Sequence, residues 1–315
     1  MAKRTTTQPQ ELKNLLAKIT EQSYLVKDIA QVLDYGLAEE ITKTVSSYPY
    51  CALDYLVSIP KDKHKDYAAA ISSRDIHPYY HWIDDNDVIK IKDIDTQHYV
   101  QLQVEKLLFR VNSYRMEAWY DNRKKIVFYD TIALQCKPEL NIDYYFAMYW
   151  FNSPFAHFLL YAQRKNTKQL TVEDLGNLPF PPLSATQYKE LAPQLSTLAE
   201  YQWCFYCEIA MFWDEFTEYF YHTKYIGTPV EYNFHQYSWE EFMKIILAIR
   251  RKMKVSLGVS QKEVKKLLYK EFQYRKHTAS ALAYKIKDLE KEVARYLYQL
   301  YKLTAEEIAW IENEK

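Results

Sequence analysis

The chain has 315 residues, of which 48% are hydrophobic and 16% aromatic, so it can build full cores for one large domain or two ordinary ones. Its formal net charge is zero, and overall electrostatics therefore does not point to a nucleic-acid or membrane partner. The four glycines lie far apart in the chain, which excludes the clustered-glycine loops that cradle phosphates and dinucleotides.

The chain begins with a polar stretch, residues 1–20, that we expect to be a flexible N-terminal segment. Within it, the apolar residues from Leu12 to Ile19 fit a short amphipathic helix. The stretch has no apolar core of a secretory signal, and no part of the chain has a run of roughly 18 apolar residues. We therefore expect a cytoplasmic protein with reduced thiols and no membrane span.

The next elements mix helix and strand. Val26–Leu33 predicts a second short helix, ended by Gly36. Asp87–Ile91 and Lys125–Tyr129 are short runs of β-branched and aromatic residues next to Asp-Asn pairs, which predicts strands with turns. Asp143–Tyr161 is aromatic, apolar and long enough for a buried helix.

The remaining part of the chain is predicted to be mainly helical. Leu178–Leu183 contains three prolines and is expected to be extended. Helix then resumes behind a capping box at Ser184–Gln187. Leu282–Leu300 carries a heptad-like apolar stripe, and Thr304–Glu307 forms a second capping box before a short final helix.

These elements predict an α+β fold. We expect the flexible segment 1–20, a mixed, β-rich domain over residues 21–183, and a largely helical C-terminal region over residues 184–315.

Patterns that would carry metal, redox or nuclease chemistry are weak. Cys204 and Cys207 form a CxxC pair, but they lie in an aromatic helical run that favours buried structural thiols. His77 and His81 are separated by a proline, which argues against a shared helical face and a metal site. The carboxylates of Asp93–Asp95 lack the following Lys of a nuclease core and fit a turn.

Basic residues concentrate between Lys244 and Lys276. This stretch has eleven Lys or Arg and two Glu, a net charge of +9. It fits contacts with a phosphate backbone and equally a solvated helical face, and both interpretations stay open.

The chain lacks the two loops of an adenine-amino methyltransferase. Such enzymes need a glycine-containing loop for S-adenosylmethionine and an Asn/Asp-Pro-Pro-Tyr/Phe loop that holds the flipped base. Phe180–Leu183 has a Pro-Pro pair with the wrong flanks. We therefore expect no catalytic residues and no cofactor in this chain.

An ordered set of short patterns resembles the TaqI-like C-terminal specificity domain of adenine-N6 DNA methyltransferases and fused restriction–modification enzymes, and more loosely the specificity subunits of type I systems. The most telling segments are Asn152-Ser153 in an aromatic helix, the Pro-rich exit Leu175–Pro182, and the terminus Leu297–Ile308. Further matching segments are Val26–Ala30, Ser73–Ile76 with Tyr79, Glu105–Arg110, and Tyr114–Asp130. The resemblance covers nearly the whole chain but not the catalytic domain of those enzymes.

The resemblance implies recognition of double-stranded DNA for a separate methyltransferase or restriction subunit, which would bind S-adenosylmethionine itself. In that case polar side chains read base edges in the major groove, and Lys or Arg side chains contact phosphates. The candidate DNA-binding residues are Arg74, Asp75, Lys106, Arg110, Asn112, Arg115, Arg123, Lys124, Gln163, Arg164, Lys165, Asn166, Lys168, Arg250, Arg251 and Lys252.

Two alternatives remain open. The chain could be the C-terminal fragment of a fused methyltransferase and restriction enzyme. It could also be a non-enzymatic protein-interaction domain held together by its aromatic core.

Overall fold

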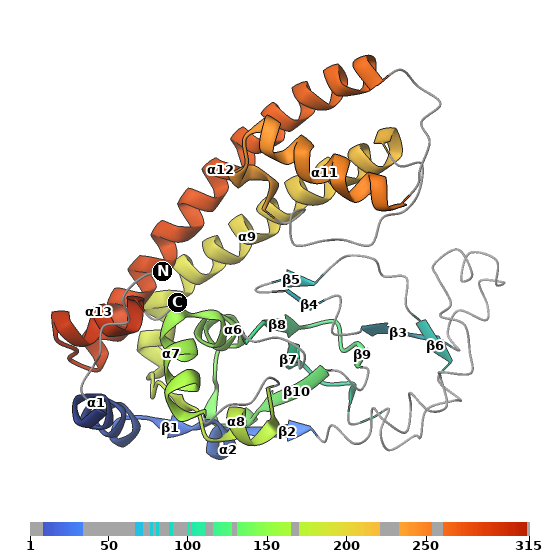
Figure 1. Cartoon of the computed structure of the whole chain (residues 1–315). Coiled ribbons are helices and arrows are strands. Elements are labelled where there is room, and N and C mark those ends of the chain that lie inside the picture. Colours follow the sequence, from blue (N-terminus) through green and yellow to red (C-terminus); the bar gives the residue numbers. More distant parts are fainter. Residues whose placement is uncertain are drawn as a thin grey trace. The chain divides into compact units, whose positions relative to one another are not determined.

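The fold is known from a computed structural model (Figure 1). It describes residues 9–33, 67–71, 76–77, 80–81, 88–90, 100, 102–110, 116–127, 131–164, 170–220, 233–253 and 261–313. The chain divides into two compact units, one formed by residues 1–196 and 292–315 and the other by residues 197–291. The first unit is therefore discontinuous in sequence, and the second is inserted into it.

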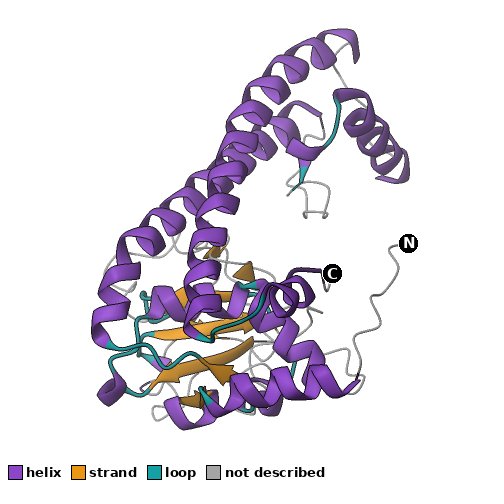
Figure 2. Ribbon diagram, turned by 90° about the vertical axis from the view of Figure 1, so that its left-hand side faces the viewer, coloured by secondary structure: helices purple, strands orange, loops and turns teal. Residues whose placement is uncertain are grey.

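A four-stranded antiparallel sheet forms the centre of the first unit. Its strand order is β2 (Ala30–Leu33), β10 (Thr131–Cys136), β7 (Lys106–Arg110) and β8 (Ala118–Asp121). The central strand β7 is buried on both faces, since the side chains from Lys106 to Phe109 are all 0% exposed. An apolar strand of this kind needs cover on both sides. Figure 2 shows the strands side by side with helices packed against them.

The prediction of a helix over Val26–Leu33 is half wrong. The helix α2 ends at Ile29 (Val26–Ile29), and the next four residues form strand β2. They pair with β10, from Ala30 opposite Cys136 to Leu33 opposite Ala133. Short apolar runs fit helix and strand equally in sequence, and the pairing with β10 decides between them.

Smaller strand pairs complete the β structure. β3 (Tyr67–Ile71) pairs with β6 (Val88–Lys90) and runs parallel to β9 (Ile126–Val127), which confirms strands within both predicted runs. β4 (Ile76–His77) pairs with β5 (Tyr80–His81). β1 (Tyr24–Leu25) pairs with β11 (Pro179–Phe180), so the Pro-rich exit is extended as predicted.

The aromatic segment after β10 forms two helices instead of the single predicted one. After the short 3-10 helix η4 (Pro138–Leu140), α6 runs over Tyr144–Asn152 and α7 over Pro154–Gln163. Pro154 has no backbone N–H, and the Ser153 side chain accepts a hydrogen bond from the Ala156 N–H, which caps α7. The break therefore lies in the Asn152-Ser153 motif.

Aromatic side chains fill the core between these helices and the sheet. α6 packs against β7 and β8. The Phe109 and Phe151 rings meet edge to face at 4.8 Å, and the rings of Phe146 and Phe180 do so at 5.8 Å. Trp150 is fully buried. Such contacts add to the free energy gained by removing the rings from water.

The N-terminal segment is a helix from Pro9 to Glu21 (α1), so the expectation that residues 1–20 are flexible is wrong for residues 9–20. Leu15 and Ile19 are buried, which confirms the amphipathic pattern. Lys18 forms an ion pair with Glu307 at 2.9 Å, and the Ser23 and Tyr301 hydroxyls are hydrogen-bonded at 2.8 Å. These contacts join the N-terminal helix to residues near the end of the chain.

The helices of the second half begin where the capping boxes predict. The short α8 (Val172–Gly176) precedes the Pro-rich exit, and α9 runs over Ala185–Phe220 behind the reciprocal hydrogen bonds of Ser184 and Gln187. The final helix α13 (Ala305–Asn313) begins at the equivalent pair of Thr304 and Glu307.

The second unit is helical throughout its described part. It contains most of α9, the 3-10 helix η5 (Phe234–Gln236), α11 (Trp239–Met253) and most of α12 (Gln261–Leu300). Phe212 stacks on Phe234 at 4.2 Å, and Phe242 and Phe272 pack beside them. Cys204 and Cys207 are free thiols. Both are half-buried, whereas the prediction places them in the core.

The α+β fold class is confirmed, and helix predominates after residue 184 as predicted. The compact units do not follow the predicted boundary, however. Both α9 and α12 contribute residues to each unit, so residues 184–315 do not form a unit of their own. Within the described part of the chain, no helix is both long enough and apolar enough to span a membrane.

Candidate nucleic-acid interface

The turn that follows β8 is a well-connected polar feature among the described residues of the first unit. It consists of residues 121–125, which we call the β8 turn, and it lies between β8 and β9. Lys124 has a φ of 57°, the left-handed conformation that a residue with a Cβ seldom adopts. Surrounding contacts must therefore hold the backbone in place.

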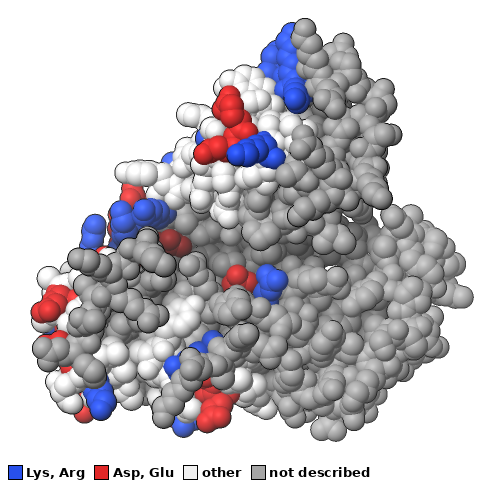
Figure 3. All heavy atoms as spheres, in the orientation of Figure 1, with Lys and Arg blue, Asp and Glu red and all other residues white. Residues whose placement is uncertain are grey.

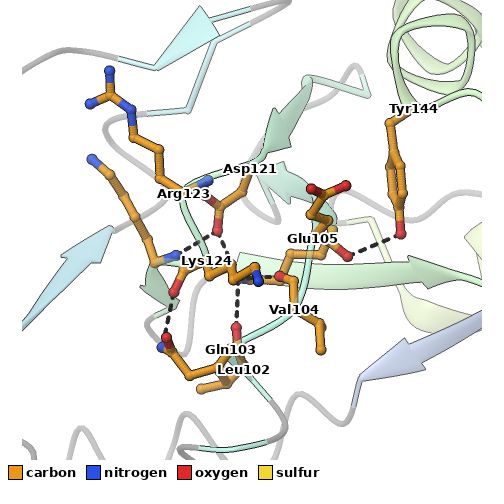
Figure 4. Close-up of polar contacts among 10 residues, drawn as sticks. Leu102, Gln103, Val104, Glu105, Asp121, Arg123, Lys124 and Tyr144 are labelled. Atoms are coloured by element: carbon orange, nitrogen blue, oxygen red, sulfur yellow. Dashed lines mark hydrogen bonds and ion pairs between the residues drawn. The ribbon is translucent and has the colours of Figure 1, made fainter.

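Asp121 holds the β8 turn from inside. Its Oδ1 accepts a hydrogen bond from the Arg123 N–H at 3.0 Å, and its Oδ2 accepts one from the Lys125 N–H at 2.8 Å. The Gln103 side-chain amide donates to the Lys124 carbonyl at 3.0 Å. Figure 4 shows these contacts converging on the turn. Polar groups on both sides of Lys124 thus fix its conformation.

The Asp121 carboxylate is itself fixed by a buried lysine. The Lys106 Nζ donates to Asp121 Oδ2 at 2.7 Å and to the carbonyl oxygens of Leu102 at 2.9 Å and Val104 at 3.3 Å. Both side chains of this ion pair are 0% exposed. Burial lowers the pKa of Lys106, and the adjacent Asp121 opposes that shift. With three acceptors, the ammonium has a partner for each of its protons.

The three residues at the tip of the turn face solvent. Asn122, Arg123 and Lys124 are all exposed, and we call them the turn tip. The Arg123 side chain extends away from the Asp121 carboxylate (Figure 4). An amide, a guanidinium and an ammonium are donors that suit base edges and phosphates. The turn therefore combines a rigid base with a polar, accessible end.

A tyrosine cluster lies beside the turn. The Tyr120 hydroxyl donates to Glu105 Oε2 at 2.7 Å, and the Tyr120 ring stacks on Tyr144 at 4.8 Å. The Tyr144 hydroxyl donates to the Glu105 carbonyl at 3.0 Å and accepts from the Cys136 N–H at 3.2 Å. Burial raises the pKa of Tyr144 to about 12 and that of Cys136 to about 12, so both groups stay neutral at physiological pH.

Three of the predicted DNA-binding residues have internal partners. The prediction that Lys106 contacts DNA is wrong, because its ammonium is fully buried. The Arg164 side chain is only 6% exposed and donates through Nε and NH2 to Asp174 Oδ2, so it braces the start of α8 instead of facing a ligand. Arg110 is half-buried and reaches Glu117 at 3.4 Å.

Of the other candidates, Arg123, Lys124 and Gln163 are exposed, and the turn brings the first two together. Arg250, Arg251 and Lys252 lie in α11, and their side chains are outside the described part. The remaining candidates also lie outside the described residues, namely Arg74, Asp75, Asn112, Arg115, Lys165, Asn166 and Lys168.

Some basic side chains of the stretch from Lys244 to Lys276 form contacts inside the second unit. Arg275 pairs with Glu208 at 3.0 Å and with Glu271, and these carboxylates raise its pKa although burial opposes them. The Lys276 ammonium donates to the Tyr237 carbonyl. On the face shown in Figure 3, a group of described basic side chains at the top of the view has no acidic side chain beside it, and lower down basic and acidic side chains are interspersed.

Comparison with known proteins leaves the family open. No protein-family model matches the sequence, and no curated protein matches it significantly. The resemblance to the TaqI-like specificity domain therefore stays a prediction.

Two residues that carry this resemblance have structural roles. The Asn152 amide donates to the carbonyls of Ala118 and Met148, and its Oδ1 accepts from the Ala118 N–H at 2.9 Å. Asn152 thus pairs with the backbone of β8 as a neighbouring strand would. Ser153 caps α7. The motif fixes α6 against the strand that leads into the β8 turn.

The residues that support the site, Asp121, Glu105 and Tyr120, are not among those predicted from the sequence. An Asp-Asn pair at the end of a strand is a turn signal, and the Asp side chain commonly accepts from the backbone two residues further on. That signal could have identified Asp121. Nothing in the sequence indicates that Lys106 is its partner 15 residues earlier. In the described part of the chain no His, Cys, Asp and Glu side chains group as a metal site would require.

Proposed function

We propose that the protein recognises double-stranded DNA and acts as a specificity domain or subunit for an adenine-N6 DNA methyltransferase of a restriction–modification system. The β8 turn carries the DNA-binding part of this proposal. It offers three adjacent donor side chains on a backbone whose shape is fixed before any ligand binds. Preorganisation of this kind lowers the entropic cost of binding. The restriction–modification part rests on the sequence resemblance alone.

The turn tip suits readout of a base pair. An Arg side chain can donate two hydrogen bonds to guanine, and an Asn side chain can pair with adenine. Lys124 adds a flexible point charge that suits a phosphate. The tip therefore combines the two kinds of contact that sequence-specific DNA binding requires.

Selection from a random duplex pool with the full chain tests the proposal. A preferred sequence should emerge, and Arg123→Gln should weaken its binding by roughly 5- to 150-fold, equivalent to 1–3 kcal/mol, with little change for unrelated duplexes. Lys13→Gln is the matched control, because it removes one exposed charge from α1. Equal binding of all duplexes, or equal effects of both substitutions, would contradict sequence recognition.

Two further measurements separate the parts of the proposal. Replacing Arg250, Arg251 and Lys252 together with Gln should weaken all duplexes alike and reduce the salt slope by up to roughly three, if all three contact phosphates. An unchanged slope would mean that the basic stretch is a solvated helical face or contacts a protein partner.

For the methyltransferase connection, proteins that copurify with the chain from its host should methylate adenine in the selected site. The purified chain alone should not.

A further inference from the structure

The buried pair of Lys106 and Asp121 lies directly beneath the turn tip. Lys106 is the first residue of β7 and Asp121 the last residue of β8, and these two residues are opposite each other in the sheet register. The pair therefore ties the end of the sheet to the turn. A buried ion pair is a weak source of stability, because removing both charges from water costs much of what their attraction gains.

The geometric effect of the pair on the backbone is specific to the residues that would contact DNA. The two N–H groups that Asp121 accepts belong to Arg123 and Lys125, on either side of Lys124. The left-handed Lys124 thus lies between two anchored amides. The Lys106 ammonium donates to the Asp121 carboxylate, which accepts both of these N–H groups. Lys106 also donates to two backbone carbonyls, which fix its position. A chain of direct contacts runs from the sheet to the turn tip.

We propose that Lys106 and Asp121 are positioning residues that set the backbone of the β8 turn for duplex DNA, and that site selectivity depends on this backbone geometry as well as on the side chains of the tip. The inference rests on the proposed DNA recognition. Neither residue touches DNA, since both are fully buried. They act through the orientation of Asn122, Arg123 and Lys124.

The sharpest test compares two substitutions of one exposed residue. Lys124→Gly and Lys124→Val remove the same charge, but glycine adopts the left-handed conformation freely and the β-branched valine opposes it. Because Lys124 is exposed, neither change replaces an atom of the buried pair, and apart from the shared loss of charge both act on the turn backbone alone. Valine should lower the affinity ratio of the selected site to a scrambled duplex by about tenfold relative to glycine. Equal ratios for the two variants would overturn the proposal.

A second variant tests the buried pair itself. In Asp121→Asn one acceptor oxygen becomes a donor, so one of the two anchored amides loses its partner. We expect faster hydrogen exchange at the Arg123 or Lys125 amide and a lower selectivity ratio, measured well below the unfolding temperature. Lys18→Met is the control, because it breaks the Lys18–Glu307 ion pair away from the turn. It should leave both quantities unchanged.

The outcomes distinguish this inference from the proposed function. If the unsubstituted chain binds no duplex selectively, both fail. If it binds selectively and Lys124→Val equals Lys124→Gly, only the positioning role fails, and the side chains alone then determine selectivity. If Lys18→Met lowers selectivity as much as Asp121→Asn, the effect is a general loss of stability and the positioning role is again refuted.

Discussion

Replacement of Lys106 by Met should cost more stability than any surface substitution in the first unit. The Lys106 ammonium has three acceptors between 2.7 and 3.3 Å, and Met is of similar length and cannot replace any of these hydrogen bonds. Asp121, also 0% exposed, would then lose its cationic partner. Removing one member of a buried pair typically costs about 3–5 kcal/mol. For a unit of this size the midpoint of thermal unfolding should fall by roughly 6–20 °C.

Urea unfolding followed by circular dichroism measures this loss directly. The double variant Lys106→Met with Asp121→Asn should recover part of it, because the amide removes the unpaired charge. The recovery should remain incomplete, since the amide can accept only one of the two backbone N–H groups. A loss of less than about 1 kcal/mol for Lys106→Met would refute the reasoning, because it would place the pair among solvent-screened ion pairs.

Three further predictions concern the first unit. Asn152→Ala should destabilise it by roughly 2 kcal/mol in urea unfolding, because both backbone groups of Ala118 lose their partner, and a change below about 0.5 kcal/mol would contradict the strand-like role. Thr304→Ala should cost about 1 kcal/mol in the same assay through loss of the α13 cap, whereas Thr304→Ser should be nearly neutral. Burial raises the pKa of Tyr144 to about 12 and that of Tyr301 above its usual 10.0. The stability that these two neutral, buried hydroxyls give is therefore complete below pH 10 and is lost as the pH rises toward and beyond 12. The unfolding free energy should fall over that range, less steeply in Tyr301→Phe, and an unchanged slope in this variant would count against Tyr301 as a source.

Local sequence signals predicted the elements whose causes are local. The capping residues Ser184 and Thr304 begin helices as expected, because their hydrogen bonds involve residues three positions away. The prolines of Leu178–Leu183 keep that segment extended, since they remove donors and restrict φ. The apolar spacing of α1 also predicted its buried face.

The wrong predictions involve partners that lie beyond the next helical turn, from ten to about a hundred residues away in the chain. Ala30–Leu33 is a strand because of β10, about a hundred residues later. In the sequence Lys106 is one basic residue among many, and only the fold shows that its side chain is buried and paired with Asp121. Arg164 was misassigned for the same reason, because Asp174 occupies its guanidinium. Side-chain charge can be read from sequence, but burial and pairing depend on the tertiary fold.

The discontinuity of the first unit has a consequence for biosynthesis. Phe155 packs against Tyr298 and Tyr301, and Lys18 pairs with Glu307. These residues of the first half of the chain therefore cannot form their contacts until more than a hundred further residues have left the ribosome. The helices of the inserted unit are made in the interval and can form from local contacts. The first unit must complete its folding afterwards. In a nascent chain stopped before residue 298, the Phe155 ring would lack the two tyrosine rings that pack against it. Translation speed through α12 would then set how long that apolar surface stays open to chaperones or to aggregation.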